Sequence, residues 1–345
     1  MSDISKWLQS HSASDPNSRP APWLEHLRNH IISRGVKVMC GSADAVSTAA
    51  TTDTPLVSAA VRLGWLKALG AVGVKSFVTK SGLGYDFVCH TGDLANYPFY
   101  YRRAYQAELE LVGTWLQGVN TPVIYDIGAN DGFFSTHLAQ ILAGRFPKIY
   151  AFEPVPPTFT KLVQSVQRLG LKDPIHPVQA AVVDDPGVVW ISHSERKSLL
   201  AQVSPGPLNH RVGDKLTQVE GITLDGFYSS EGAFPNLLKI DVEGSEPAVL
   251  RGAQGLLSRP DRPAILFECN PITLTECGAA VQTLLELLPG YALHYVDDLS
   301  GQVIPFGSPV QAEKIDWICN LFAVPLTEYS RRRWATVLKH PAPGS

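Results

Sequence analysis

The stretch from Val123 to Gly132 constrains the fold of this chain more than any other segment. It reads Val-Ile-Tyr-Asp-Ile-Gly-Ala-Asn-Asp-Gly, so an apolar run ends at Asp126 and a glycine-rich turn follows. A helical pattern begins directly after the turn, at Phe133. This order predicts a buried parallel strand, a tight loop and a helix N-terminus. In a doubly wound sheet, an adenosine-containing cofactor binds at such a turn.

Beyond residue 120, apolar strand patterns alternate with helical patterns, which predicts a doubly wound, mostly parallel α/β sheet. We expect seven strands, at residues 123–126, 149–152, 176–182, 237–241, 264–268, 292–296 and 317–324. Helices are expected at 133–143, 159–169 and 279–288, and another begins near Glu246. Asn and Pro residues near the last strand favour an antiparallel position at an edge of the sheet.

The segment ahead of this pattern is expected to form an N-terminal extension or cap, residues 1–120, with helices and a β-hairpin around Ser81-Gly-Leu-Gly. Residues 121–330 then form the cofactor-binding catalytic domain, and 331–345 form a C-terminal tail. Residues 184–231 are polar and rich in Pro and Gly, which indicates a long loop that covers a site or is disordered.

Composition narrows the class of protein. A formal net charge of −3, with no long run of Lys or Arg, argues against a nucleic-acid partner. The five cysteines are scattered and form no Cys-x-x-Cys pair, which argues against a disulfide framework or a zinc site and favours the cytoplasm. The most apolar early stretch, 61–78, is interrupted by charges, so no membrane span is expected. The extension is a candidate element for homodimer formation.

Carboxylates and one amide follow the predicted strands at the points where these strands end. They are Asp126, Glu153, Asp184, Asp241 with Glu243, and Glu268 with Asn270. Ligands of open α/β sheets bind outside the carboxyl ends of the strands. The sequence therefore predicts that these side chains surround one ligand site.

The turn after the first strand favours a particular kind of cofactor. Gly128 and Gly132 allow the backbone to approach a ligand closely, and Asn130 lies between them in a Gly-x-Asn-x-Gly pattern. The third glycine of a dinucleotide turn is absent, so a cofactor without phosphates fits better, and S-adenosylmethionine (SAM) is such a cofactor. Asp126 is expected near its ammonium group and the loop N–H groups near its carboxylate. The alternative is a glycine turn that serves packing alone.

Two further cofactor contacts are expected from the following strands. Glu153, held at a sharp strand end by Pro154, is expected to accept hydrogen bonds from the ribose hydroxyls. A helix N-cap contact is the alternative for this residue. Asp184 is expected near the adenine, although an acidic turn with Asp185 explains it equally well.

Four segments resemble the motifs of the FkbM family of SAM-dependent methyltransferases. They are Asp-Ile-Gly-Ala-Asn-Asp-Gly-Phe-Phe-Ser from Asp126, Ala-Phe-Glu-Pro at 151–154, Leu-Lys-Ile-Asp-Val-Glu-Gly-Ser-Glu at 238–246 and Val-Leu-Arg-Gly-Ala at 249–253. The resemblance covers roughly residues 105–270. It implies a class I methyltransferase (Rossmann-like) domain at 121–330 and methyl transfer to oxygen, commonly on a sugar or another natural-product hydroxyl.

A hydroxyl acceptor needs a general base, or a metal ion that lowers its pKa. Asp241 is the first candidate for the base because it ends the central strand, and Glu243 shares its surroundings. Helix capping is the alternative for Asp241, and stabilisation of the helix dipole is the alternative for Glu243. His210 in the long loop is a third catalytic candidate.

Asp241, Glu268 and Asn270 together form an oxygen-rich set that suits Mg²⁺. A cation there would chelate the oxygens of the acceptor. The alternative is that Glu268 binds a backbone amide or the acceptor hydroxyl directly.

Two other classes of protein remain open from the sequence. One is a nicotinamide-dependent oxidoreductase, against which the missing third glycine argues. The other is a non-catalytic binding protein with the same fold, against which the full set of carboxylates argues.

Overall fold

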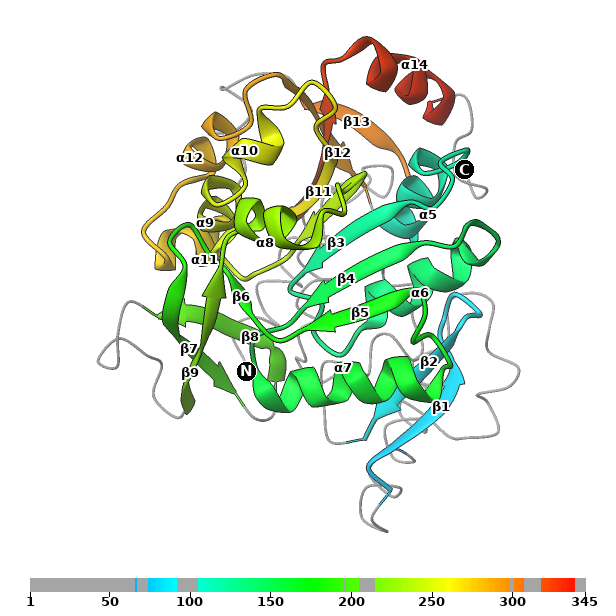
Figure 1. The fold of residues 1–345 in the computed structure, drawn as a ribbon, viewed down its shortest axis with the longest axis vertical. Helices are drawn as coiled ribbons and strands as arrows, with labels where there is room; N and C mark the ends of the chain where they lie inside the picture. The colour runs from blue at the N-terminus through cyan, green and yellow to red at the C-terminus, as the bar shows by residue number, and fades with distance from the viewer. Residues whose placement is uncertain are drawn as a thin grey trace, which may run out of the picture.

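The computed structural model describes residues 66, 74–91, 105–194, 197–204, 215–297, 301–306 and 318–338. Most of the predicted extension, and with it the predicted homodimer element, therefore lies outside the described residues. Within the described part, an eight-stranded sheet forms the centre of the molecule, in the order β13-β12-β14-β11-β10-β3-β4-β5 (Figure 1). Its strands are β3 (Val123–Ile127), β4 (Lys148–Phe152), β5 (Ile175–Val178), β10 (Leu237–Ile240), β11 (Ala264–Cys269), β12 (Tyr291–Val296), β13 (Val303–Phe306) and β14 (Cys319–Pro325).

Strands β11, β10, β3, β4 and β5 pair in parallel, as predicted. Two details of the prediction are wrong. The described sheet has an eighth strand, because β13 adds to β12 in antiparallel orientation. Strand β14 is antiparallel as expected, but it lies between β11 and β12 and not at an edge. Its residues Leu321 to Pro325 are buried, which suits a strand with neighbours on both sides.

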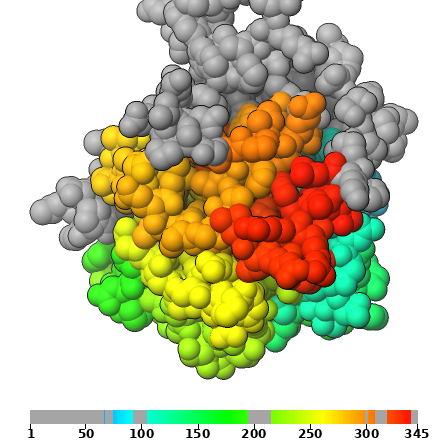
Figure 2. Space-filling view, turned by 90° about the horizontal axis from the view of Figure 1, so that it is seen from above, coloured from blue at the N-terminus to red at the C-terminus, as the bar shows by residue number. Residues whose placement is uncertain are grey.

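Helices cover both faces of the sheet and enclose two apolar cores. On one face lie α8 (Leu224–Glu231), α9 (Glu246–Arg251), α10 (Gln254–Leu257), α11 (Pro271–Glu276) and α12 (Val281–Glu286). On the other face lie α5 (Gln106–Trp115), α6 (Phe133–Ile141), α7 (Pro156–Arg168) and α14 (Glu328–Val337). Figure 2 shows α14 at the surface next to the segment that contains α5, with which it is in contact.

Helix α14 spans the expected boundary at residue 330, and its Trp334 packs into the same core as Trp115 of α5. Residues 331–338 therefore pack onto the domain. Among the described residues, no helix is both long and apolar enough to cross a lipid bilayer.

The segment at 184–231 is not the continuous loop expected from its polarity. It contains β7 (Gly187–Ser194), β8 (Lys197–Ser204), β9 (Lys215–Ile222) and α8. These strands form a second sheet in the order β6-β9-β7-β8. The predicted strand at 176–182 is also split, since β5 ends at Val178 and β6 (Ala181–Val182) pairs with β9. The second sheet therefore begins beside the carboxyl end of β5.

The predicted hairpin is confirmed as β1 (Ser76–Lys80) and β2 (Asp86–His90). It is fastened to α6 by His137, whose Nδ1 lies 2.7 Å from the carbonyl oxygen of Phe133 and whose Nε2 lies 2.8 Å from the hydroxyl of Ser81. Burial lowers the pKa of His137 to about 4. The neutral ring therefore donates from Nδ1 and accepts from Ser81, because a carbonyl oxygen can only accept.

Candidate functional site

A cavity opens at the carboxyl ends of β3, β4 and β10, with about 860 Å³ of space that includes the solvent at its mouth. Its walls combine the glycine-rich turn, the ends of the strands and part of the second sheet. The predicted site residues that line it are Gly128, Asn130, Glu153, Pro154, Asp241 and Glu243.

The glycine-rich turn passes so close to the end of β10 that it excludes a side chain. At Gly128, φ is +78°, and an added Cβ would lie 1.9 Å from the carbonyl oxygen of Asp241. Gly132 has φ +89°, and its Cβ would lie 2.7 Å from the side chain of Leu162. Gly132 does not line the cavity, so its glycine serves packing against α7. Glycine is therefore required at the two positions for different reasons, which are the close approach to β10 at Gly128 and packing against α7 at Gly132.

Glu153 stabilises the same glycine-rich turn through hydrogen bonds from the backbone. Its Oε2 accepts a hydrogen bond from the N–H of Asn130 at 3.1 Å, and its Oε1 accepts one from the N–H of Val155 at 2.9 Å. Burial raises the pKa of Glu153 to about 7, against the opposing effect of these two donors. The carboxyl therefore faces the cavity in an apolar setting where its charge is sensitive to pH near neutrality.

A buried row of polar side chains runs under the cavity. Asp126 on β3 and Lys239 on β10 are register partners, and Nζ of Lys239 lies 3.2 Å from Oδ1 of Asp126. Oδ2 of Asp126 accepts a 2.6 Å hydrogen bond from the hydroxyl of Ser135 on α6. Asp126 is fully buried and is not among the lining residues, whereas Lys239 is. In this geometry Asp126 forms an ion pair with Lys239 and positions its ammonium group.

The ammonium group of Lys239 connects this row to the cavity. It also donates to the carbonyl oxygen of Gly128 at 3.2 Å and lies 3.7 Å from Oδ2 of Asp241. Burial by itself lowers the pKa of Lys239, but Asp126 and Asp241 outweigh it and hold that pKa above its ordinary value. Lys239 is therefore a permanent cation between two carboxylates.

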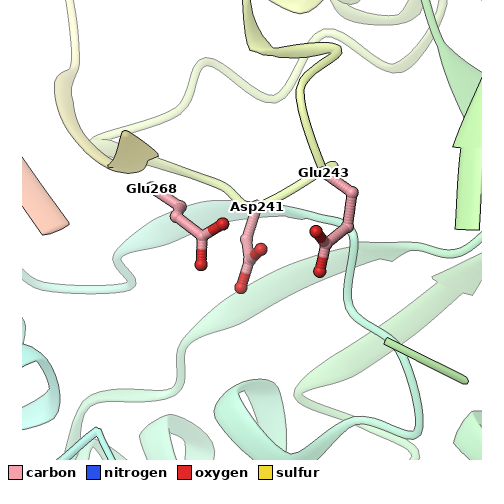
Figure 3. A group of neighbouring side chains, drawn as sticks. All are labelled: Asp241, Glu243 and Glu268. Carbon is pink, nitrogen blue, oxygen red and sulfur yellow. The ribbon is translucent and has the colours of Figure 1, made fainter. Parts of the chain in front are cut away.

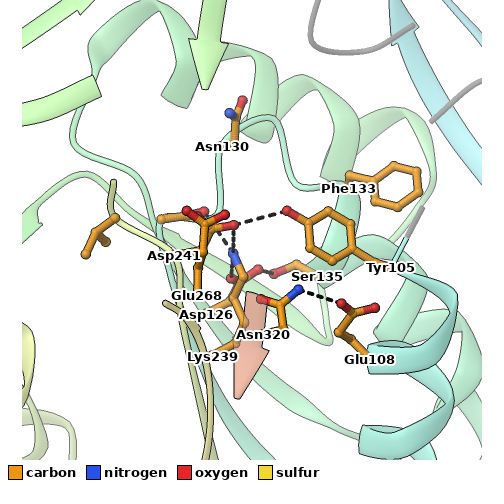
Figure 4. Close-up of polar contacts among 12 residues, drawn as sticks. Tyr105, Glu108, Asp126, Asn130, Phe133, Ser135, Lys239, Asp241, Glu268 and Asn320 are labelled. Atoms are coloured by element: carbon orange, nitrogen blue, oxygen red, sulfur yellow. Dashed lines mark hydrogen bonds and ion pairs between the residues drawn. The ribbon is translucent and has the colours of Figure 1, made fainter. Parts of the chain in front are cut away.

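Tyr105, at the start of α5, reaches the cavity from the opposite side. Its hydroxyl donates a 3.0 Å hydrogen bond to Oδ2 of Asp241 (Figure 4). A second contact of the same helix joins Glu108 to Asn320 of β14.

Asp241, Glu243 and Glu268 form a cluster in which one carboxylate oxygen from each lies within 4.8 Å of the others. Figure 3 shows the three carboxylates directed to the same side. Within the part of the chain that the structure describes, the carboxylate oxygens of this cluster could hold a cation. It differs from the predicted set, because Oδ1 of Asn270 accepts from the N–H groups of Ile272 and Thr273 and caps α11.

The turn after β10 is held by Glu246, a residue that the sequence analysis gave no role beyond starting a helix. Its Oε1 accepts hydrogen bonds from the N–H groups of Val242, at 3.1 Å, and Gly244, at 3.2 Å. Burial, and then the charge of Glu268, raises the pKa of Glu246 to about 8. These bonds fix the turn that carries Asp241 and Glu243 into the cavity.

Backbone strain gathers at this site. Among the described residues, five other than glycine have positive φ, and three of them line the cavity: Tyr105 at 59°, Asn130 at 53° and Glu243 at 57°. Such conformations cost energy and persist where the surrounding structure enforces them, commonly at functional sites.

Asp184 and the histidines lie elsewhere. Asp184 forms an ion pair with Arg251 at 2.9 Å, both side chains being nearly half exposed, and does not line the cavity. His193 lies in β7, where its Nε2 is 2.9 Å from the hydroxyl of Thr217. His210 lies outside the described residues.

Several lining residues were missed by the sequence analysis. The apolar wall near β5 consists of Ala180 and of three residues of the second sheet, namely Ala181 and Val182 on β6 and Ile191 on β7. The continuous apolar run Val-Val-Trp-Ile at 188–191 could have indicated that strand. Tyr105 and Lys239 carry no such local signal.

Residues 126–294 match the family model of the methyltransferase FkbM domain. No curated protein sequence matches the chain. Among solved structures, the chain is similar to a methyltransferase FkbM from Methylobacillus flagellatus KT, with 15% identity over 61% of this chain and 47% of that one, and a TM-score of 0.36. It thus spans about half of that protein.

Two further structures are similar at the same level. The SAM-dependent methyltransferase from Agrobacterium tumefaciens shares 10% identity over 72% of this chain and 69% of that one, with a TM-score of 0.38. Cofactor-bound Rv0187 from MTB shares 15% identity over 65% and 81%, with a TM-score of 0.37.

Proposed function

We propose that this chain, whose residues 126–294 belong to the methyltransferase FkbM family, transfers a methyl group from SAM to a hydroxyl of a small molecule. The expected class I fold is confirmed, with a doubly wound and mostly parallel sheet between two layers of helices. The SAM-dependent methyltransferase assignment follows from the family. The hydroxyl acceptor, a sugar or another natural product, is the proposal. The observation that carries it is that one cavity is lined by both Glu153 and Asp241.

For the cofactor, Glu153 is the proposed acceptor of hydrogen bonds from the ribose hydroxyls. The apolar wall of Ala181, Val182 and Ile191 suits the adenine ring. Backbone N–H groups of the turn at 128–132 suit the carboxylate of the methionine part. Asp126 contributes through Lys239, since its own oxygens are engaged below the cavity.

For the reaction, Asp241 is the proposed general base. The acceptor oxygen forms a bond to the methyl carbon as the carbon–sulfur bond breaks, S-adenosylhomocysteine (SAH) leaves, and the hydroxyl proton passes to the Asp241 carboxylate. Because sulfonium is a good leaving group, alignment of the two reactants supplies much of the rate. Glu243, which also lines the cavity, is the proposed contact for a neighbouring acceptor hydroxyl.

A divalent cation is the second way to activate the hydroxyl, and the cluster of Asp241, Glu243 and Glu268 is the observation that favours it. Turnover that is unchanged in EDTA supports the base. Turnover that is lost in EDTA and restored by Mg²⁺ supports the cation.

Calorimetry with SAM, SAH and NAD⁺ tests the cofactor. Binding of SAM and SAH without NAD⁺ supports the proposal, NAD⁺ binding indicates an oxidoreductase, and binding of none indicates a non-catalytic protein. A panel of sugars and phenols with methyl-labelled SAM then tests the acceptor. Asp241→Asn should keep SAH affinity within about threefold and reduce turnover by roughly 100-fold or more. Full turnover in this variant contradicts the assignment of the base.

A further inference from the structure

Tyr105, the residue before α5, lies outside the segment that matches the family model, because that segment starts at residue 126. Tyr105 is nevertheless one of the lining residues of the cavity. Its backbone has φ 59° and ψ 19°, a left-handed conformation that is unusual for a tyrosine. A strained residue at the wall of the site is a reason to ask what its side chain does there.

The ring of Tyr105 is held on the side of α6. Its centroid lies 6.3 Å from that of Phe133 and 6.0 Å from that of Phe134. This packing directs the hydroxyl toward the end of β10, where it donates to Oδ2 of Asp241 (Figure 4). Burial, and then the negative charge of Asp241, raises the pKa of Tyr105 well above its ordinary value. The phenol therefore keeps its proton and remains a donor across the neutral range.

The two oxygens of Asp241 are not equivalent in this arrangement. Oδ2 accepts from Tyr105 at 3.0 Å and faces the ammonium group of Lys239 at 3.7 Å. Among the described residues, no hydrogen bond or ion pair engages Oδ1. The carboxylate is thus fixed by one oxygen and open at the other, which is the geometry that a general base needs.

We infer that Tyr105 is a positioning residue that reserves Oδ2 of Asp241 and leaves Oδ1 to take the proton of the acceptor hydroxyl. The inference rests on the proposed function. It also means that the segment ahead of the family domain completes the catalytic site of that domain.

Several charged groups lie around Asp241 and around Tyr105 and Lys239, the two residues that contact its Oδ2. They come from every neighbouring element: Asp126 on β3, Glu108 on α5, Lys239 on β10, Glu243 in the following turn and Glu268 on β11. A substitution of Tyr105 leaves all of them in place. The difference between variant and wild type therefore reports the single donor.

The first test is Tyr105→Phe, which keeps the ring contacts with Phe133 and Phe134 and removes the hydroxyl. We expect SAH affinity within about threefold of wild type and kcat lower by roughly 10- to 100-fold, with KM for SAM little changed. Tyr291→Phe is the matched control, since that hydroxyl donates to the carbonyl oxygen of Pro263 outside the cavity.

A second measurement needs no acceptor and shows whether the contact exists in solution. In a double-mutant cycle, Tyr105→Phe should lower the urea midpoint of wild type but change that of Asp241→Ala much less. For turnover, Tyr105→Phe should add less than about threefold in the Asp241→Asn background.

The outcomes separate this inference from the proposed function. Equal effects of Tyr105→Phe in the wild-type and the Asp241-substituted backgrounds overturn the role of Tyr105 even if Asp241→Asn is inactive. Absence of SAH binding by the wild-type protein, or full turnover of Asp241→Asn, contradicts the proposed function instead.

Discussion

Nζ of Lys239 lies 3.2 Å from Oδ1 of Asp126, with both side chains buried between the sheet and α6. The two residues face each other across neighbouring parallel strands. Because the pair lies beneath the cavity, the acid that ends the first central strand stabilises a lysine of the site. Its expected position beside the ammonium group of a cofactor stays a prediction, and in the structure its two oxygens contact Lys239 and Ser135.

Asp126→Asn should therefore act first on stability. Removing one charge of a buried pair leaves the other uncompensated, which costs roughly 3–5 kcal/mol. Urea denaturation at pH 7 measures the loss of unfolding free energy. The control is Asp86→Asn, which breaks a pair with Lys80 whose side chains are about half exposed and should cost about 0–1 kcal/mol. Similar costs for the two variants would contradict the role of Asp126.

Gly128→Ala tests the close approach of the turn to β10. A Cβ there would lie 1.9 Å from a backbone oxygen, so the turn must move, and both stability and SAH affinity should fall. Gly118→Ala is a matched control, because Gly118 has φ +79° and open space around it. It should cost only the left-handed strain, about 1–2 kcal/mol, and leave SAH binding unchanged. Calorimetry with SAH on both variants decides the point.

Glu153→Gln tests the ribose contact through its pH dependence. The pKa of Glu153 is about 7, so the wild-type carboxyl becomes protonated as the pH falls from 8 to 6. Wild-type SAH affinity should therefore weaken over that range, whereas the variant should bind about 1–3 kcal/mol more weakly at pH 8 and show little pH dependence. Titrations at pH 6, 7 and 8 measure this, with Glu231→Gln, outside the cavity, as the control. A wild-type affinity independent of pH argues against the contact.

Glu246→Gln should change how stability depends on pH. The pKa of Glu246 is about 8 in the fold and 4.5 ordinarily, so the native state holds a proton that the unfolded chain has lost between these values. The wild-type free energy of unfolding therefore falls as the pH rises from 4.5 to 8 through this group. The variant keeps an acceptor for the N–H groups of Val242 and Gly244, and its free energy of unfolding should not fall with pH through this group.

Urea denaturation at pH 5 and pH 8 provides the measurement for Glu246. The stability of the variant relative to wild type should improve between these values, by on the order of 1–3 kcal/mol. Glu286→Gln, on the exposed face of α12, should show no such trend. A constant difference between Glu246→Gln and wild type would falsify the expected protonation.

Local patterns were enough for much of the architecture. The apolar runs that end at Asp126, Glu153 and Asp241 mark β3, β4 and the end of β10, and the predicted ligand turn at Gly128 lines the cavity. These features follow from chain neighbours, since a strand, its turn and its helix are coded within about 20 residues. Among the strands at 187–222, β7 carries an apolar run at 188–191 that was not used, whereas polar residues interrupt the apolar positions of β8 and β9.

The candidate site was predicted in part for a related reason. Residues that follow a strand of the sheet were found, because the carboxyl ends of parallel strands meet at one edge. Tyr105, which reaches the cavity from α5, and Lys239, which lies inside a strand, have no such marker. Asn270 was assigned to the metal set by its position, and the structure shows that its side chain caps α11 instead.

By itself, the sequence determined the order of strands and helices, the glycine turn and the acids at the strand ends, because periodicity and turn chemistry act along the chain. Tertiary structure decided which of those acids face the cavity, which one holds a lysine beneath it, and which oxygen of Asp241 is occupied. Those outcomes depend on side chains from β3, β10 and α5 meeting in three dimensions. Burial then sets their charges, and neither contact nor burial can be read from a single segment.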